Sequence, residues 1–290
     1  MIDKPDNSIL KAFTGLEGGV VASGSTCGVI SGGAMGLAIS HYEEIINNGL
    51  PAQVGMLSLI GDYMKWFDKK YNTTFCRERT GVNFYSGMGQ LRYFTPGDKV
   101  AKCMWHIRGA LRHLYSTFQY EIPKNISISK TSDKPFHCAK QVLEGIKEQT
   151  GITNERLENL SFIFDGGVGL QGGVCGALAG AIMGINLLVG MNIRDNSYFQ
   201  NVKAFTIGHY NLLRDEQIES PEPFNVGKQI VDKFKKEAGN LECKAITGKR
   251  FSACDEFQEF AQSSDKCAQL IELATNEASK QIETYKQPAT

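Results

Sequence analysis

The stretch GGVGLQGGVCGALAGAIMG at residues 166–184 repeats the stretch GGVVASGSTCGVISGGAMG at residues 18–36. Nine residues are identical at a constant offset of 148 positions, without a gap. Each copy carries one cysteine, Cys27 or Cys175, where a glycine-rich approach gives way to a helical pattern. A period this long predicts two tandem domains and excludes a solenoid of short repeats.

The other cysteines extend the repeat. Cys76 and Cys243 each follow a Lys-Lys pair, and one further cysteine follows in each copy, Cys103 or Cys267. The C-terminal copy also has a leading cysteine, Cys138, whose equivalent in the N-terminal copy would precede Met1. With the surplus Cys254 this accounts for all 8 cysteines of the chain. The sequence thus predicts a four-cysteine set in the C-terminal copy and a three-cysteine set in the N-terminal copy.

The pattern outside the repeated stretch is helical. Apolar residues recur at spacings of three and four over residues 53–70, 97–118 and 256–283, and Ser263-Ser264-Asp265 is able to interrupt the last of these. No run of alternating polar and apolar residues argues for strands. We therefore expect an all-α protein of two homologous helical domains with glycine-rich helix starts, residues 1–125 and 126–290. The stretch 196–220 is interpreted as an insertion of loop and short helix in the C-terminal copy.

The cysteine order resembles that of a known family. An isolated Cys138, then Cys175-Gly-Ala-Leu-Ala-Gly180, then two separated cysteines is similar to the redox-active proteins named for a C_GCAxxG_C_C pattern. A similar domain occurs in split-Soret cytochrome c. The N-terminal copy matches more loosely, because Val29 stands where the family has alanine. No Cys-x-x-Cys-His is present, so covalent haem is not implied.

The resemblance implies a four-cysteine redox site that binds an iron-sulfur cluster, either 2Fe-2S or 4Fe-4S. Its metal ligands would be Cys138, Cys175, Cys243 and Cys267. Cys27, Cys76 and Cys103 would form a second site with a vacancy, which a histidine would complete or which a substrate would use. Alternatively, this copy has lost its cofactor and only supports the other copy structurally. The histidines considered as the fourth ligand are His41, His106 and His113. Zinc fits four thiolates as well but is less favoured.

The glycines have a predicted role beside the cysteines. A helix that starts near Gly173 presents unpaired N–H groups to Cys175, which predicts a lowered thiol pKa. Glycines spaced four apart leave a strip on which a cofactor or a neighbouring helix approaches the backbone closely. The predicted cofactor-binding glycines are Gly173, Gly176 and Gly180 in the C-terminal copy and Gly28 and Gly32 in the N-terminal copy.

A metal-free alternative remains open. In thiol-disulfide or sulfur chemistry, Cys175 would be the attacking thiol and Cys254 or Cys267 the resolving partner. Under the cluster hypothesis the protein is an electron carrier or an oxidoreductase component, and it needs a redox partner protein. The sequence leaves the choice between carrier and enzyme open.

Composition limits the remaining classes. A net charge of +0 argues against a nucleic-acid binder. The polar N-terminus predicts no secretory signal, so the expected location is the cytoplasm, where thiols stay reduced. The charge-free runs 18–40 and 166–193 are long enough to cross a bilayer, but they are glycine-broken and lack a positive-inside pattern, so buried helices are favoured over membrane association. The glycine faces leave room for a homo-oligomer.

Overall fold

The computed structural model describes residues 6–118, 121–123, 135–214 and 223–286. Its N-terminal copy contains seven α-helices and one 3-10 helix: α1 (Asn7–Phe13), η1 (Thr14–Leu16), α2 (Gly28–Ser40), α3 (Tyr42–Asn48), α4 (Leu50–Tyr71), α5 (Cys76–Thr80), α6 (Gly87–Phe94) and α7 (Asp98–Thr117). The C-terminal copy begins with α8 (Cys138–Thr150), α9 (Glu155–Leu160), η2 (Ser161–Phe164) and α10 (Gly176–Val189). It ends with α11 (Tyr198–Asn211), α12 (Pro223–Ala238), α13 (Cys243–Thr247), α14 (Cys254–Ser263) and α15 (Asp265–Lys286).

The all-α prediction is confirmed. In the described part of the chain the only β-pairing is two isolated bridges, Thr26 with Phe75 and Val174 with Glu242. The pattern at residues 53–70 lies inside α4, the pattern at 97–118 corresponds to α7, and the pattern at 256–283 spans α14 and α15 with the break at Ser264. The predicted boundary between residues 125 and 126 falls within 124–134, outside the described residues.

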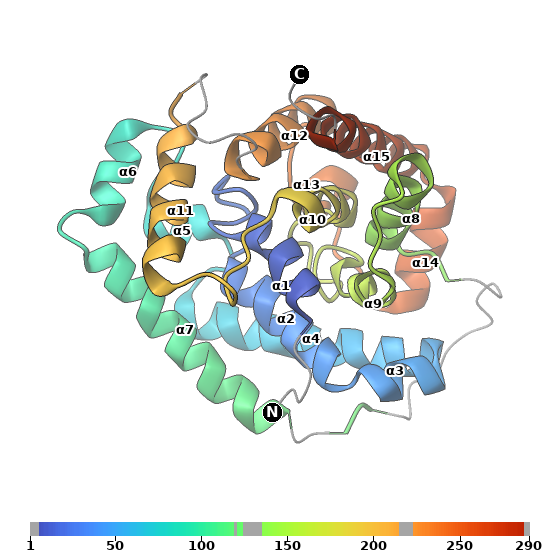
Figure 1. The fold of residues 1–290 in the computed structure, drawn as a ribbon. Coiled ribbons are helices and arrows are strands. Elements are labelled where there is room, and N and C mark those ends of the chain that lie inside the picture. Colours follow the sequence, from blue (N-terminus) through green and yellow to red (C-terminus); the bar gives the residue numbers. More distant parts are fainter. Residues whose placement is uncertain (1–5, 119–120, 124–134, 215–222, 287–290) are drawn as a thin grey trace.

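The two copies share one order of elements. α1, η1 and α2 in the first copy correspond to α9, η2 and α10 in the second, and α4 to α7 correspond to α12 to α15. Within the described ranges, α8 and α11 have no counterpart in the first copy, and α3 has none in the second. In the C-terminal copy α8, α10 and α15 pack against one another, and α12 covers α10. α1 of the N-terminal copy packs on α10, so the copies share a single hydrophobic core (Figure 1).

The repeated Gly-Gly-Val stretch forms a left-handed turn. In each copy five consecutive residues, 18–22 and 166–170, have φ between +50° and +82°. This conformation costs about 1–2 kcal/mol for each residue with a side chain, here Val20, Val21, Ala22, Val168 and Leu170. Glycines at the other positions reduce that cost. The turn reverses the chain after η1 or η2 and returns it as the loop that carries Cys27 or Cys175.

The charge-free run of the C-terminal copy is explained by burial. Nearly all residues of α10 are buried, including the polar Asn186, which donates to the carbonyl of Ile182. Among the described residues no helix is both long and apolar enough to span a membrane.

Candidate cysteine site

The four predicted ligands of the C-terminal copy line one small cavity. Cys138 is the first residue of α8, Cys175 precedes α10, Cys243 is the first residue of α13, and Cys267 lies in the first turn of α15. All four face a cavity of about 20 Å³, whose walls are mainly apolar. The apolar wall consists of Ala177, Ile246, Phe251, Phe257, Phe260, Leu270 and Ile271. Four separate helices therefore bring the four cysteines to one cavity, where Cys138, Cys175 and Cys243 are buried and Cys267 is partly exposed.

Backbone hydrogen bonds fix the spacing of two of these cysteines. The N–H of Cys175 donates to the carbonyl of Leu241 (2.8 Å), and the N–H of Cys243 donates to the carbonyl of Gly173 (2.7 Å). The N-terminal copy repeats this exchange: Cys27 donates to the carbonyl of Thr74 (2.9 Å) and Cys76 to that of Ser25 (2.8 Å). Each copy thus holds one pair of cysteines, Cys175 and Cys243 or Cys27 and Cys76, by the same two-way bridge.

A buried acid clamps the start of α8. Nδ1 of His137 lies 2.7 Å from Oδ2 of Asp165, and both side chains are buried. Asp165 also accepts the backbone N–H of Cys138, while burial raises its pKa. Asp165 therefore orients the first residue of α8, and with it the thiol of Cys138. Oδ1 of Asp165 has no hydrogen-bond partner within the described residues.

Burial dominates the electrostatics of the thiols. Burial raises the pKa of Cys175 to about 11, although the N–H groups of Ala177 and Leu178 at the start of α10 lower it. The prediction of a lowered pKa at Cys175 is therefore wrong in its net direction. The helix donors are present, but α10 begins at Gly176, and loss of solvation outweighs them.

Negative charge on one cysteine of the cavity also raises the pKa of its neighbours. The pKa of Cys138 is raised by burial first, then by Asp165, and further by Cys175, Cys267 and Cys243. The pKa of Cys243 is raised by burial, with added contributions from Cys175 and Cys267. Thiolates in this cavity would therefore be stable only around a positive centre.

The three cysteines of the N-terminal copy line a much larger space. Cys27, Cys76 and Cys103 face a cleft of about 570 Å³ between η1, α2 and α7. Cys103 is the sixth residue of α7, whereas Cys267 is the third residue of α15, so the last cysteine is displaced by about one helical turn between the copies. The wall is mainly apolar, with Phe13, Leu16, Phe84, Leu111, Leu114 and Phe118 among its residues.

An arginine replaces an apolar wall residue in this second site. Arg79 of α5 corresponds to Ile246 of α13, and its Nη1 donates to Sγ of Cys27 (3.0 Å). Its guanidinium lies over the rings of Phe67 (4.6 Å) and Tyr71 (5.5 Å) and is buried. Burial raises the pKa of Cys27, and Arg79 partly offsets this.

The remaining predicted residues lie elsewhere. None of the three candidate histidines lines the cleft: His41 contacts the carbonyl of Leu37, His106 packs on Tyr71 and His113 stacks on Trp66. Cys254 faces a different cavity, beside Gly61 and Gln171, and so does not join Cys175. No group of three or more His, Cys, Asp or Glu side chains in the described ranges is set around a single metal ion.

The predicted glycines divide between the site and the packing. Gly176 lines the small cavity, and Gly28 and Gly32 line the large cleft. Gly180 instead faces the backbone of Ala139 in α8, where an added Cβ would lie 2.8 Å from the carbonyl oxygen. Gly173 lies before the helix, where it accepts the N–H of Cys243.

Sequence reasoning missed the acids that precede the left-handed turns. Glu17 and Asp165 stand at the same offset as the nine identities, one position before Gly18 and Gly166. Extending the aligned stretch by one residue would have found them. Glu17 lines the large cleft, and burial raises its pKa to about 8. Nε2 of His209 in α11 lies 4.0 Å from its Oε1, so the insertion of the second copy reaches the site of the first.

Fold and site together define a duplicated all-α protein whose copies present a closed four-cysteine site and an open three-cysteine site. The chain belongs to the family described as "Putative redox-active protein (C_GCAxxG_C_C)", whose model matches residues 1–115 and 136–280. The two matched segments confirm both the resemblance and the tandem duplication. A search of curated proteins and a search of solved structures returned no match.

Proposed function

We propose that the C-terminal copy binds an iron-sulfur cluster through Cys138, Cys175, Cys243 and Cys267, and that the protein transfers electrons to or from a redox partner protein. The observation that carries this proposal is the convergence of four cysteines from four helices on one mainly apolar cavity, three of them buried and Cys267 partly buried. Iron-sulfur clusters take four cysteine thiolates, and the positive charge of their iron relieves the mutual repulsion of those thiolates. When bound, such a cluster accepts and releases single electrons.

The chain's own residues have defined tasks in this function. The N–H groups of Ala177 and Leu178 donate to the Cys175 sulfur, and hydrogen bonds to sulfur set the potential of cluster sites. Asp165 and His137 hold Cys138 in place from outside the cavity. Phe251 and Phe257 exclude water from the thiols.

The thiol-disulfide alternative has less support. An attacking cysteine needs an exposed thiolate, but Cys175 is only 9% exposed and burial raises its pKa to about 11. Of the two proposed resolving partners, Cys267 lines the same cavity and Cys254 does not. Zinc is a second metal that four thiolates would hold, and elemental analysis separates it from iron.

The test is anaerobic purification followed by visible absorption spectroscopy and assays for iron and acid-labile sulfide. We expect a coloured protein that contains both. Single replacement of each of the four ligands by alanine should remove most of the iron of the C-terminal site. Cys254→Ala is the matched control, because Cys254 is also buried at the start of a helix but faces another cavity. Colourless, iron-free wild-type protein would refute the proposal, as would full iron in all four ligand variants.

The N-terminal copy is proposed as a second, three-cysteine site. Cys27, Cys76 and Cys103 share one cleft, and Arg79 supplies a positive charge beside them. Iron content compared between the wild type and the Cys76→Ala variant tests whether this site also binds iron. Equal iron in both proteins would restrict iron binding to the C-terminal copy.

A further inference from the structure

The helix α8 covers a defined surface of the C-terminal copy. An added Cβ at Gly180 would lie 2.8 Å from the carbonyl oxygen of Ala139, and one at Gly184 would lie 2.5 Å from Cδ1 of Ile146. α8 therefore lies directly on the glycine strip of α10. It also packs on α15, where Gly145 faces the side chain of Thr275.

The equivalent strip on α2 is open. An added Cβ at Gly32 would meet no atom within 4 Å, and one at Gly36 would meet only the ring of Phe118, at 3.8 Å. Gly32 is exposed although it lies in the middle of a mostly buried helix. In the part of the chain that the structure describes, no helix lies on this strip, and the cleft of about 570 Å³ begins there.

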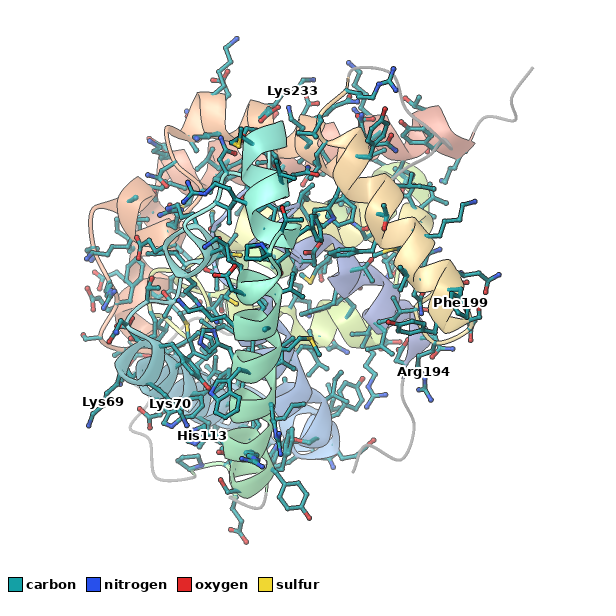
Figure 2. All side chains as sticks on the ribbon, turned by 90° about the vertical axis from the view of Figure 1, so that its left-hand side faces the viewer. Lys69, Lys70, His113, Arg194, Phe199 and Lys233 are labelled. Carbon is teal, nitrogen blue, oxygen red and sulfur yellow. The ribbon has the colours of Figure 1, made fainter. Side chains whose placement is uncertain are left out.

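The outer face of α7 is uncovered in the same way. Counted from the first residues of α7 and α15, Leu111 and Tyr115 correspond to Ala278 and Ile282. Ala278 and Ile282 are fully buried, whereas Leu111 is 60% exposed and Tyr115 is 71% exposed. α7 runs along the front of the molecule in Figure 2, with no helix drawn over it. Met104 and Leu111 line a further hollow on this face.

One polar group marks where a covering helix would begin. Asp165 accepts the first backbone N–H of α8, and Glu17 stands at the equivalent position in the N-terminal copy. Oε2 of Glu17 is buried and has no hydrogen-bond partner within the described residues. A carboxylate in this place suits the positive end of a helix, whose first N–H groups need acceptors.

We propose that the groove between α2 and α7 binds an amphipathic helix of a partner chain, which docks with its N-terminus at Glu17 as α8 docks at Asp165. The two copies supply the template: the glycine strip, the apolar face of the long helix and the acid that receives the N-terminus are all present twice. Among the described residues, the C-terminal copy alone has its own helix on them.

The groove also specifies the chemistry of the partner helix. The partner helix needs a small residue where it crosses Gly32, because in the C-terminal copy the small residue Ala139 of α8 lies against Gly180. It needs acidic residues on the flank that faces Arg108 and Arg112, two exposed arginines of α7. The last requirement rests on the proposed function: a cysteine at the first position of the partner helix would complete the set formed by Cys27, Cys76 and Cys103.

The first experiment grafts a second copy of residues 135–154 in front of Asn7, which reproduces the order of α8 and α9 because Glu155 corresponds to Asn7. The graft is needed because an isolated helix of this length is marginal in water. We expect amide hydrogen exchange in residues 28–36 to slow at least about tenfold relative to the ungrafted protein, since a docked helix covers them. The same graft on a Gly32→Leu background should give no such protection.

A second experiment supplies the helix in trans. A synthetic peptide of residues 135–151 with Cys138 replaced by serine avoids disulfide formation, and its G145E form places a carboxylate opposite Arg108. We expect the G145E peptide to bind more tightly than the G145K peptide, and both to lose at least about tenfold affinity for the Gly32→Leu protein, since that side chain occupies the strip. Circular dichroism checks that the Gly32→Leu protein is folded.

Three outcomes would overturn the proposal. The first is unchanged amide hydrogen exchange of residues 28–36 in the grafted protein, and the second is equal slowing of that exchange on the Gly32→Leu background. The third is a small apolar molecule that native mass spectrometry finds bound in the cleft and that the peptide does not displace. Iron analysis is a separate readout. Docking of the serine peptide to iron-free protein would support this inference even if the proposed function failed.

Discussion

The two copies hold one pair of cysteines, Cys175 and Cys243 or Cys27 and Cys76, in the same way and then differ in what surrounds that pair. The left-handed turn and the backbone exchange recur in both. In the C-terminal copy α8 and α15 close a cavity of about 20 Å³, whereas in the N-terminal copy a cleft of about 570 Å³ stays open. The loop therefore places the thiols, while the helices packed over it decide whether the site is closed or accessible.

The largest expected difference between the copies concerns the acids that precede the left-handed turns, Asp165 and Glu17, and their effect on the free energy of unfolding. Asp165→Ala should lower the free energy of unfolding by about 3 kcal/mol, because it leaves the buried His137 and the N–H of Cys138 without their acceptor. Glu17→Ala is the matched variant and should cause no loss of stability, since no short hydrogen bond to Glu17 is described and burial disfavours its charged form. Denaturant unfolding measures both. Equal losses would show that the two acids have the same structural role.

The next largest expected difference concerns the glycine strips of α10 and α2, compared by the effect of a leucine at Gly180 or Gly32 on stability. Gly180→Leu should destabilise the protein by about 2 kcal/mol, because the new side chain would collide with the backbone of α8. Gly32→Leu should instead raise the free energy of unfolding by about 0.5 kcal/mol, since the space around Gly32 is open and leucine favours helix. The midpoint of urea unfolding distinguishes the two. A loss at Gly32 as large as that at Gly180 would mean that the strip on α2 is already covered.

Stability should depend on pH through Glu17. Burial raises the pKa of Glu17 from 4.5 to about 8, so between these values the folded state holds a proton that the unfolded state has released. Stability should therefore fall as the pH rises from 6.5 to 8, and Glu17→Gln should reduce that slope. Burial lowers the pKa of His209 from 6.5 to about 4, so its opposite effect is confined to lower pH. Urea midpoints at pH 6.5 and 8 check this, and an unchanged slope in the variant would contradict it.

The smallest expected effect concerns thiol reactivity. Arg79 lowers the pKa of Cys27, against the larger effect of burial. Arg79→Ile, which copies Ile246 of the other site, should therefore slow alkylation of Cys27 severalfold at pH 8. Mass spectrometry of iodoacetamide-treated protein gives the rate, and Cys254 serves as the internal control. Faster alkylation of Cys27 would indicate that Arg79 acts mainly by blocking access.

Sequence patterns predicted the helices better than the site. The three- and four-residue spacing located α4, α7 and the pair α14 and α15, because an apolar stripe is a local property. The seven cysteines named as ligands do fall into two shared spaces. The left-handed turn was not predicted, because Val20 and Leu170 rarely adopt positive φ and only the surrounding fold imposes it.

Other features depend on contacts that no local pattern contains. The stretch 196–220, predicted as loop and short helix, contains the 14-residue helix α11, and its residues 215–220 lie outside the described residues. His209 of α11 packs against Phe84 and Phe94 of the N-terminal copy. The net pKa of Cys175 depends on how deeply the whole fold buries it. Arg79 could be aligned with Ile246, but its contact with Cys27 follows only from the placement of α5 against α2.

Thr26 of the N-terminal cysteine loop contacts the cysteine loop of the C-terminal copy. Its Oγ1 accepts the N–H of Val174 at 2.8 Å, and the same oxygen would lie 2.6 Å from a Cβ added at Gly173. A larger residue in one cysteine loop therefore has to be matched by a smaller residue in the other. Duplication usually frees one copy to drift, but here each loop forms part of the wall around the other, so the halves have to change in step.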